Sequence, residues 1–433
     1  MPVAKIAQPD DATPPTEESW LKKLGPGLIT GAADDDPSGI ATYSQAGAQF
    51  GFGMLWTLIF TYPLMVGIQI VSARIGRVTG HGLATNIRKH YSGWLLYPIV
   101  GLLLLANTIN IAADVAAMGD AMKLVAGGKA QWYAVGFGLV SVLLQVFVPY
   151  SKYVRVLKWL TLALLAYVAT VFVVHIPWAQ VAKEGVVLPS LPWKPAFITT
   201  IVAVFGTTIS PYLFFWQASQ EVEDLRADAN AHPLKKAPHE ARAGYTRIKL
   251  DTYIGMGFSN LVAFFIMLTT AVTLHMHGIT EIETSAQAAT ALRPIAGNFA
   301  FMLFAMGIIG TGMLAIPVLA GSAAYAISGA FKWTNSLEHE PAVAPKFYGI
   351  IVVATLAGVG LVFAPIDPIK ALYWSAVING VISIPIMAVM MLMAARTDVM
   401  GRLVITRRLK VLGWLCTAVM AAAVTAMFVT TLG

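Results

Sequence analysis

Long apolar runs with almost no charged side chains dominate this sequence. Of its 433 residues, 57% are hydrophobic and only 12% are charged, a balance that soluble globular domains do not show. A helix needs about 20 apolar residues to cross the hydrocarbon core of a bilayer, and it satisfies its own backbone there. The sequence therefore predicts an all-α integral membrane protein. We expect eleven transmembrane helices, at residues 25–50, 54–73, 94–122, 131–149, 154–176, 197–220, 252–275, 297–329, 347–365, 369–395 and 411–431.

The 29 Lys and Arg residues, which contribute to a net charge of +7, are distributed unevenly around these runs. Most of them lie before the first run or after an even-numbered run, and such a bias marks the cytoplasmic side. We therefore expect a multi-pass protein of the plasma or inner membrane with a cytoplasmic N-terminus, an external C-terminus and no nucleic-acid partner. The single cysteine, Cys416, falls inside the last run and excludes an intramolecular disulfide.

Two of the runs contain helix breakers, at residues 33–39 (Ala-Asp-Asp-Asp-Pro-Ser-Gly) and 206–212 (Gly-Thr-Thr-Ile-Ser-Pro-Tyr). A helix is broken inside a membrane only where protein or a ligand satisfies the freed backbone groups. Three adjacent carboxylates in a span are costly, which makes them candidates for function. Paired breaks point to a transporter site near the bilayer midplane. A surface turn at 33–39 and a simple proline kink at 206–212 are the structural alternatives.

The positions of the two breaks divide the chain into two halves of five spans each. We expect a disordered cytoplasmic tail at 1–22, a first repeat at 23–176, a second repeat at 197–395 and an additional span at 408–433. An odd number of spans per repeat makes the two repeats inverted relative to each other. Opposed half-helices then meet at one site, where the carbonyls at helix C-termini carry partial negative charge suited to a cation.

Three short motifs carry a resemblance to a known family. Residues 25–28 (Gly-Pro-Gly-Leu), 36–39 (Asp-Pro-Ser-Gly) and 45–48 (Gln-Ala-Gly-Ala) resemble the first-helix signature of the Nramp family of divalent-metal transporters. The stretch from residue 206 lies where that family has its sixth-helix signature, and the resemblance covers essentially the whole chain. It implies a LeuT-type fold, a 5+5 inverted repeat with discontinuous helices 1 and 6 plus one extra C-terminal helix. It also implies a transporter rather than an enzyme, with no resident cofactor.

The resemblance also assigns residues of the two breaks to a metal site. Asp36 keeps the metal-binding aspartate of the family, and Gly39 stands where the family has an asparagine. In the second break, Ser210 replaces a methionine and Tyr212 replaces a histidine. The residues whose carbonyls are expected to face the metal are Ala33 and Thr207.

On helix ten, the metal-facing glutamine of the family falls on Ala376, with Asn379 one turn further along. We expect Asn379 to face the ion, with a hydrogen bond between helices as the alternative interpretation.

These departures resemble the Nramp-related magnesium transporters, a side branch of the family. A lost thioether removes the soft ligand, and an all-oxygen site suits Mg²⁺. In the family, a second acidic residue on helix three and a pair of arginines on helix nine serve proton coupling. This sequence has Ala117, Ile350 and Ile351 at those positions. We therefore expect a monomeric uniporter that imports hydrated Mg²⁺ by alternating access and also accepts Mn²⁺.

Further polar residues are candidates for the ion pathway. Asp34 and Asp35 either line a vestibule or contact another helix. Asp114 is either a remnant of a proton route or a structural partner of Asn107 or Asn110. Gln217 and Glu221 follow the second break and either line the cytoplasmic exit or lie on a solvated helix end.

Three other functions remain as alternatives at this stage. The nearest is a proton-coupled Mn²⁺/Fe²⁺ symporter of the ordinary Nramp type, in which Ser210 is a tolerated substitution. An intramembrane aspartyl protease would use Asp36 and Asp114 as a pair that shares a proton. A sodium-coupled transporter of organic solutes would place Asp36 against the carboxylate of its substrate. The sequence contains no nucleotide-binding, zinc-protease or serine-nucleophile motif.

Overall fold

The computed structural model describes residues 30–31, 33–148, 161–187, 192–228 and 230–432. Throughout these residues the regular secondary structure is helical, as the apolar runs predict. The tail predicted at 1–22 lies outside the described residues, as does the beginning of the span predicted at 154–176.

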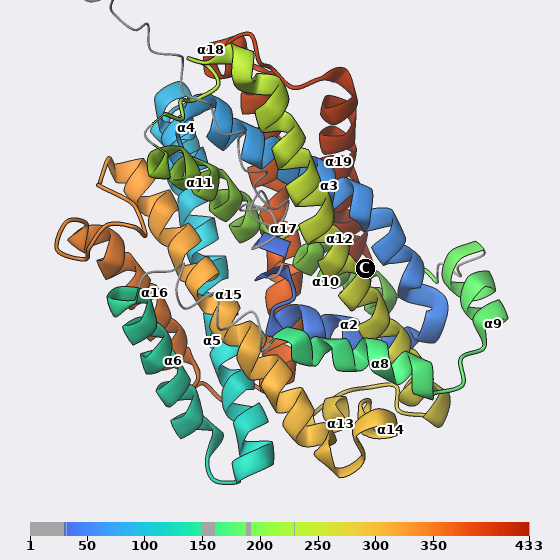
Figure 1. Ribbon diagram of the computed structural model, residues 1–433. Helices are drawn as coiled ribbons and strands as arrows, with labels where there is room; N and C mark the ends of the chain where they lie inside the picture. The colour runs from blue at the N-terminus through green and yellow to red at the C-terminus, as the bar shows by residue number, and fades with distance from the viewer. Residues whose placement is uncertain (1–29, 32, 149–160, 188–191, 229, 433) are drawn as a thin grey trace, which may run out of the picture.

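The longer helices coincide with the predicted runs, and Figure 1 labels them. In chain order the α-helices are α2 (Pro37–Phe50), α3 (Leu55–Thr79), α4 (Leu83–His90), α5 (Gly93–Ala126), α6 (Ala130–Phe147), α8 (Leu165–Val173), α9 (Trp178–Ala182), α10 (Pro195–Thr208), α11 (Pro211–Ala227), α12 (Ala241–Thr273), α13 (Ser285–Thr290), α14 (Arg293–Ala296), α15 (Ala300–Phe331), α16 (Pro345–Leu361), α17 (Pro368–Ala395), α18 (Thr397–Met400) and α19 (Arg407–Leu432). Short helical turns are η2 (Gly51–Met54), η3 (Thr161–Leu164), η4 (Lys183–Val187), η5 (Pro238–Glu240), η6 (His275–His277) and η7 (Gly297–Phe299).

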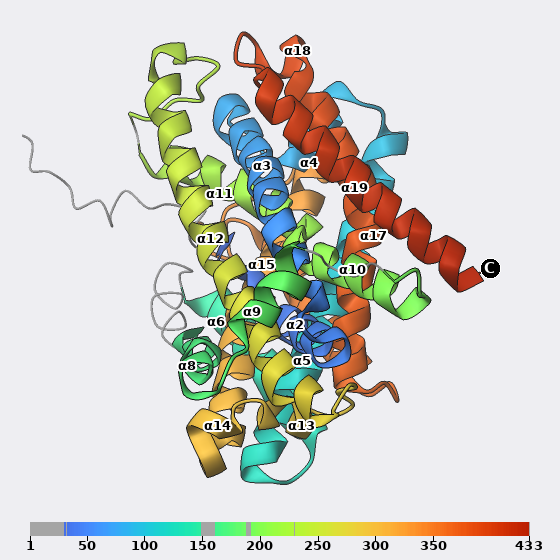
Figure 2. The same cartoon turned by 90° about the vertical axis from the view of Figure 1, so that its right-hand side faces the viewer.

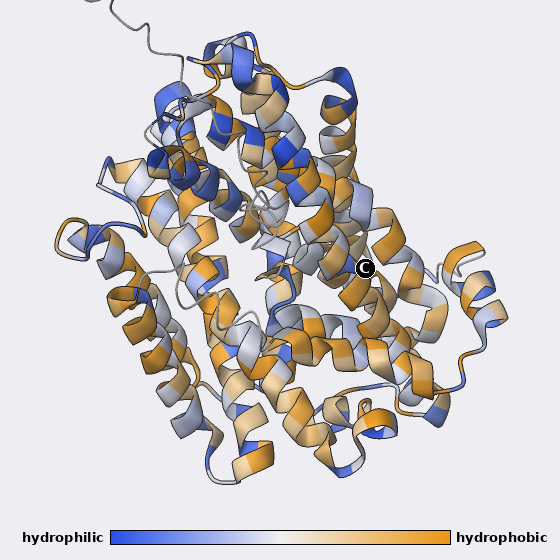
Figure 3. Ribbon diagram, in the orientation of Figure 1, coloured by the Kyte–Doolittle hydropathy of each residue, from blue (hydrophilic) through white to orange (hydrophobic). Residues whose placement is uncertain are grey.

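Within the described residues, eight helical stretches are long and apolar enough to cross a membrane, or nine if the bent pair 162–173 and 178–187 forms one span. The first two predicted spans fall into one stretch, Pro37–Thr79, and α16 is shorter than the others. The total of eleven therefore stays a prediction. Hydrophilic residues gather at the end of the bundle where α4, α11 and α18 lie, while the rest of the bundle is largely apolar (Figure 3). The protein is thus a multi-pass helical membrane protein.

The centre of the bundle is built on α5 and α15, which run side by side (Figure 1). Helix α5 also packs against α6, α16 and α17, and α15 is almost entirely buried from Gly307 to Ala330. Helix α2 lies across the bundle against α12, α17 and α10, as Figures 1 and 2 show. The two predicted breaks therefore lie in the interior, between elements of both halves.

Both breaks occur where the sequence predicts them. Residues 33–34 are helical, Asp36 has extended backbone with φ −72° and ψ 170°, and Pro37 begins α2. Helix α10 ends at Thr208, and Ser210 is extended with φ −79° and ψ 134° before Pro211 begins α11. Proline occupies the first position of each following helix, where its missing N–H has no helical partner to lose.

Candidate metal site

Asp36 is the N-cap of α2 at the first break. Its Oδ1 accepts a hydrogen bond from the backbone N–H of Gly39 at 2.7 Å, the arrangement that favours aspartate at this position. Only 2% of Asp36 is exposed. One carboxylate oxygen is therefore fixed by the local helix start, and the other is directed to partners elsewhere in the fold.

At the second break, Ser210 satisfies the end of its own preceding helix. Its hydroxyl lies within hydrogen-bond distance of the carbonyl oxygens of Gly206, at 2.8 Å, and Thr207, at 2.9 Å. These are carbonyls that lose their helical partners where α10 ends. A carbonyl oxygen has two lone pairs, so the Thr207 oxygen keeps acceptor capacity while it bonds Ser210.

The two breaks meet at Tyr212, the second residue of α11. Its hydroxyl lies 3.3 Å from the Ala33 carbonyl oxygen and 3.3 Å from Asp36 Oδ2. Tyr212 is fully buried, and Ala33 is 1% exposed. Three groups that the sequence assigned to one site thus converge, an aspartate, a backbone carbonyl and a phenol, and they come from both broken helices.

Gly39 and Gly206 allow close approach around these groups. A Cβ at Gly39 would lie 3.2 Å from Thr207 Oγ1 and 3.3 Å from Tyr43 Cε2. The position where the family has an asparagine side chain is therefore occupied here by neighbouring side chains.

Helix α17 lies directly against the second break. A Cβ at Gly206 would lie 2.9 Å from the Cα of Gly380 and closer still to the Ala376 carbonyl oxygen. Asn379, beside Gly380, is 1% exposed, and its Oδ1 has no hydrogen-bond partner among the described residues. The backbone of Ala376 thus faces the second break, and Asn379, one turn further along α17, has a side-chain oxygen without a partner among the described residues.

Asp34 and Asp35 contact α12 through one serine. The Ser259 hydroxyl lies 2.6 Å from Asp34 Oδ2 and 3.1 Å from Asp35 Oδ1. Both aspartates are buried. The contact with another helix, one of the two interpretations drawn from the sequence, is therefore present, and Ser259 is a residue that the sequence did not single out.

Asp114 on α5 corrects one sequence-based interpretation. The Asn107 amide donates to the Leu319 carbonyl oxygen at 2.8 Å and to Ser322 Oγ at 2.7 Å. Neither oxygen of Asp114 and neither polar atom of Asn110 has a hydrogen-bond partner among the described residues. The prediction that Asp114 pairs with Asn107 or Asn110 was wrong, because the Asn107 side chain is directed to α15.

Gln217 and Glu221 lie in the interior and not on a solvated helix end. Gln217 contacts Thr30, the two side-chain oxygens being 2.5 Å apart, so α11 touches the chain just before the first break. Glu221 is fully buried and forms an ion pair with Arg247 of α12, which also lies 3.3 Å from Asp224. Arg247 could not be singled out beforehand, because hydropathy does not record which helices become neighbours.

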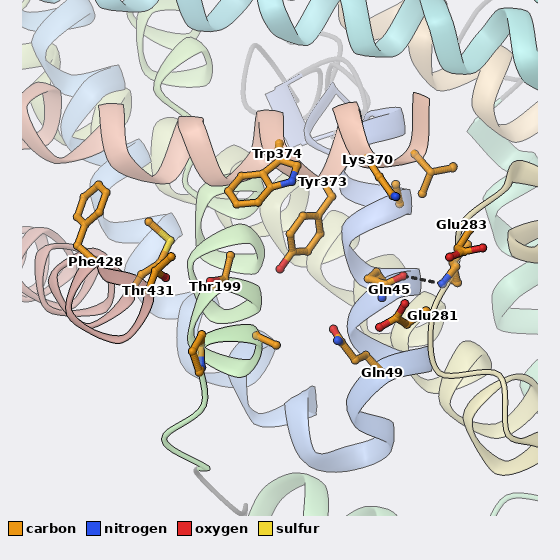
Figure 4. Close-up of a pocket in the computed structure, with 16 residues that line it drawn as sticks. Gln45, Gln49, Thr199, Glu281, Glu283, Lys370, Tyr373, Trp374, Phe428 and Thr431 are labelled. Atoms are coloured by element: carbon orange, nitrogen blue, oxygen red, sulfur yellow. Dashed lines mark hydrogen bonds between the residues drawn. The ribbon is translucent and has the colours of Figure 1, made fainter. Parts of the chain in front are cut away.

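A cavity of about 500 Å³ opens beside the C-terminal part of α2. Gln45, Gln49 and Glu281 gather at one end of it, and Trp374 and Phe428 line the other (Figure 4). The side-chain oxygen of Gln45 accepts a hydrogen bond from the Ile282 N–H at 2.9 Å. The cavity is thus lined by polar residues of α2 and by aromatic residues of α17 and α19.

No cluster of three or more His, Cys, Asp or Glu side chains with metal-binding geometry occurs in the part of the chain that the structure describes. The donors that converge at the two breaks are one carboxylate, backbone carbonyls and hydroxyls, all of them oxygen atoms.

Comparisons with known proteins place this arrangement in context. The family model for "Natural resistance-associated macrophage protein-like" proteins, Nramp, matches residues 27–430. A divalent metal cation transporter, MntH, from Klebsiella pneumoniae is 27% identical over 412 residues, which cover 93% of this chain and 92% of that protein. A crystal structure of a manganese transporter from Eremococcus coleocola superposes with a TM-score of 0.72 at 16% identity, covering 97% of this chain and 90% of that one.

More distant structures share the architecture. The structure of MhsT in complex with L-phenylalanine gives a TM-score of 0.56 at 13% identity and covers 93% of this chain and 98% of that one. These structures show a LeuT-like fold. The family model and the MntH match are those of a transporter family and not of an enzyme. The chain belongs to the Nramp family.

Proposed function

We propose that this protein carries divalent metal cations across the membrane by alternating access, with the cation bound between the two broken helices. The observation that carries the proposal is the contact of the Tyr212 hydroxyl with both Asp36 Oδ2 and the Ala33 carbonyl oxygen. A cation bound by those two oxygens would displace the hydroxyl hydrogen bond. The Tyr212 O–H then rotates away with its proton, and the phenol oxygen offers a lone pair to the ion or its water.

The other candidate residues surround this centre. The Thr207 carbonyl oxygen keeps a lone pair for the ion, since it bonds Ser210 with only one. Ser210 contacts the water shell through its hydroxyl. The backbone lies close to the second break at Gly39, beside Thr207, and at Ala376, beside Gly206. Asn379 offers a side-chain oxygen without a hydrogen-bond partner among the described residues.

Two interpretations of the cargo have different support. The named relatives, a divalent metal cation transporter and a manganese transporter, favour proton-coupled transport of Mn²⁺ or Fe²⁺. The donor set of this chain, with Ser210 and Tyr212 at the second break and Ala117 on α5, supports the finer proposal of Mg²⁺ uniport with Mn²⁺ also accepted, as in the magnesium-transporting side branch of the family. Oxygen ligands suit Mg²⁺ and Mn²⁺, whereas a thioether selects softer ions.

Uptake by purified protein in proteoliposomes distinguishes these interpretations. A pH-sensitive dye inside the vesicles records proton movement while external Mn²⁺ is taken up, and excess Mg²⁺ is added as a competitor. Uniport of hard cations predicts Mg²⁺ competition without acidification of the lumen. Acidification driven by Mn²⁺, with no effect of Mg²⁺, would establish the symporter instead. Absence of any metal-dependent flux, with a known transporter as a positive control, would contradict the proposed function.

We also propose that the protein works as a monomer in the plasma or inner membrane, with its N-terminus in the cytoplasm and its C-terminus outside. The repeats at 23–176 and 197–395 would then be inverted relative to each other, with 408–433 as an added span. The distribution of Lys and Arg supports this orientation. Protease accessibility of a tag at each terminus, measured in oriented vesicles, tests it.

A further inference from the structure

One face of α5 carries a row of buried polar side chains. Asn107, Asn110 and Asp114 are spaced by three and four residues, which places them on one side of a helix, and all three are fully buried. The Asn107 amide reaches the Leu319 carbonyl and Ser322 of α15. This face of α5 therefore looks toward α15 and not toward lipid.

The same face also borders the first break. A Cβ at Gly312 of α15 would lie 2.9 Å from Met118 Cγ and 3.3 Å from Pro37 Cγ, so Met118, one turn beyond Asp114, packs beside the start of α2. Helix α5 also packs against α2 itself. Asp114 thus lies next to the proposed cation site, and Asn110 lies one turn away from it toward the end where α5 begins.

Asn110 and Asp114 are not satisfied by the described protein residues. Both polar atoms of the Asn110 amide and both oxygens of Asp114 lack a hydrogen-bond partner among them. Each buried polar group left without a partner costs about 1–3 kcal/mol, more if charged, and such groups in a native fold call for a bound water or ion. Asp114 also forms no ion pair with a Lys, Arg or His of the described residues.

We propose that Asn110 and Asp114 form a second position for the transported divalent cation, which the ion occupies with part of its water shell after it leaves Asp36. This inference rests on the proposed function. A carboxylate and an amide oxygen are ligands suited to hard divalent cations. An ion at Asp36 and an ion at Asp114 repel each other, and such repulsion between adjacent positions speeds release. The two positions together form a short path along α5.

The test uses Mn²⁺ as the probe, because its anomalous X-ray scattering locates it directly. Crystals of the full chain grown in millimolar Mn²⁺ are expected to show anomalous density at Asp36 and a second peak beside Asn110 and Asp114.

In calorimetric titrations, wild-type protein should bind two Mn²⁺ ions, and Asn110→Leu should bind one. Asn110→Asp, which adds a carboxylate, should tighten the weaker site by about tenfold, as expected when ligand charge is raised. The control is Thr108→Val, because the Thr108 hydroxyl bonds the Leu104 carbonyl of its own helix. This substitution should leave both sites unchanged.

The outcomes separate this inference from the proposed function. A peak at Asp36 alone in wild-type crystals overturns the second position and leaves the first intact. The absence of both peaks removes the proposed function as well. If Mn²⁺ never occupies the second position and Asp114→Asn abolishes proton movement, Asp114 holds a proton and not a metal ion. If Asn110→Leu fails to fold, the wild-type crystals still decide, since the second peak is expected there.

Discussion

The two broken helices satisfy their exposed backbone in different ways. At the second break, Ser210 bonds the carbonyls of Gly206 and Thr207 within its own segment. At the first break, Asp36 caps α2 with one oxygen, while its other oxygen and the Ala33 carbonyl both reach Tyr212 in the other half of the chain. The second break is thus complete in itself, and the first depends on a partner. We infer that the second break stays rigid and forms a fixed wall of the cation site. The first break supplies the negative charge that attracts the cation.

The largest expected effect comes from removing the charge at the first break. Asparagine is an equally good N-cap. Asp36→Asn therefore removes the negative charge and keeps the side-chain oxygen that caps α2. We expect Mn²⁺ uptake to fall at least about a hundredfold, because two unit charges 4 Å apart attract by about 4 kcal/mol at an effective dielectric constant of 20. Initial uptake rates in proteoliposomes measure this, with thermal stability in detergent as the control for folding. Uptake within about threefold of wild type would remove Asp36 from the site.

A second prediction tests the rigidity of the second break. In Gly206→Val, the added side chain meets the Ala376 carbonyl and Gly380 of α17, and overpacking of this kind typically costs about 1–3 kcal/mol. The apparent unfolding midpoint in detergent should therefore fall. The matched control is Gly307→Ala, where a Cβ would meet only Leu164 at 3.5 Å. If Gly206→Val is as stable as this control, α10 and α17 can move apart and the second break is not a fixed wall.

Some features of the two breaks could be predicted from the sequence, and others could not. The helix breakers and their caps are local, so the positions of Asp36, Pro37 and Ser210 could be predicted from residue types alone. The contacts that distinguish the breaks are not local. Ser259 and Arg247 lie on α12, and neither stands out from the other polar residues of that helix in the sequence.

The same limit explains the incorrect prediction for Asp114. Helical spacing places Asn107, Asn110 and Asp114 on one face, but it does not say that α15 supplies the partners of Asn107. Similarly, the residue type at position 39 does not reveal that Thr207 and Tyr43 approach Gly39 closely. Packing between helices decides both cases, and an apolar pattern specifies a buried face without specifying its neighbour.

A smaller effect is expected where the two breaks touch. Tyr212→Phe removes the hydroxyl that lies 3.3 Å from Asp36 and from the Ala33 carbonyl. One lost hydrogen bond to a charged group is worth about 1.5 kcal/mol, so Mn²⁺ binding should weaken by about tenfold in a calorimetric titration. Tyr373→Phe is a matched control, because it removes a hydroxyl contact of 2.8 Å to Thr200 away from the breaks. Equal effects of the two substitutions would mean that Tyr212 supports packing and does not contact the ion.

The smallest effect should follow from Ser210→Ala. The substitution removes the two hydrogen bonds by which the second break satisfies itself, so the unfolding free energy should fall by about 1 kcal/mol. Mn²⁺ binding should change by less than about threefold, since the Thr207 carbonyl loses a partner but keeps its position against α2, where its side chain approaches Gly39. Calorimetry and thermal unfolding on the same preparation measure both quantities. If Ser210→Ala weakens binding as much as Tyr212→Phe does, the serine hydroxyl contacts the ion directly, and the second break supplies a ligand rather than a fixed wall.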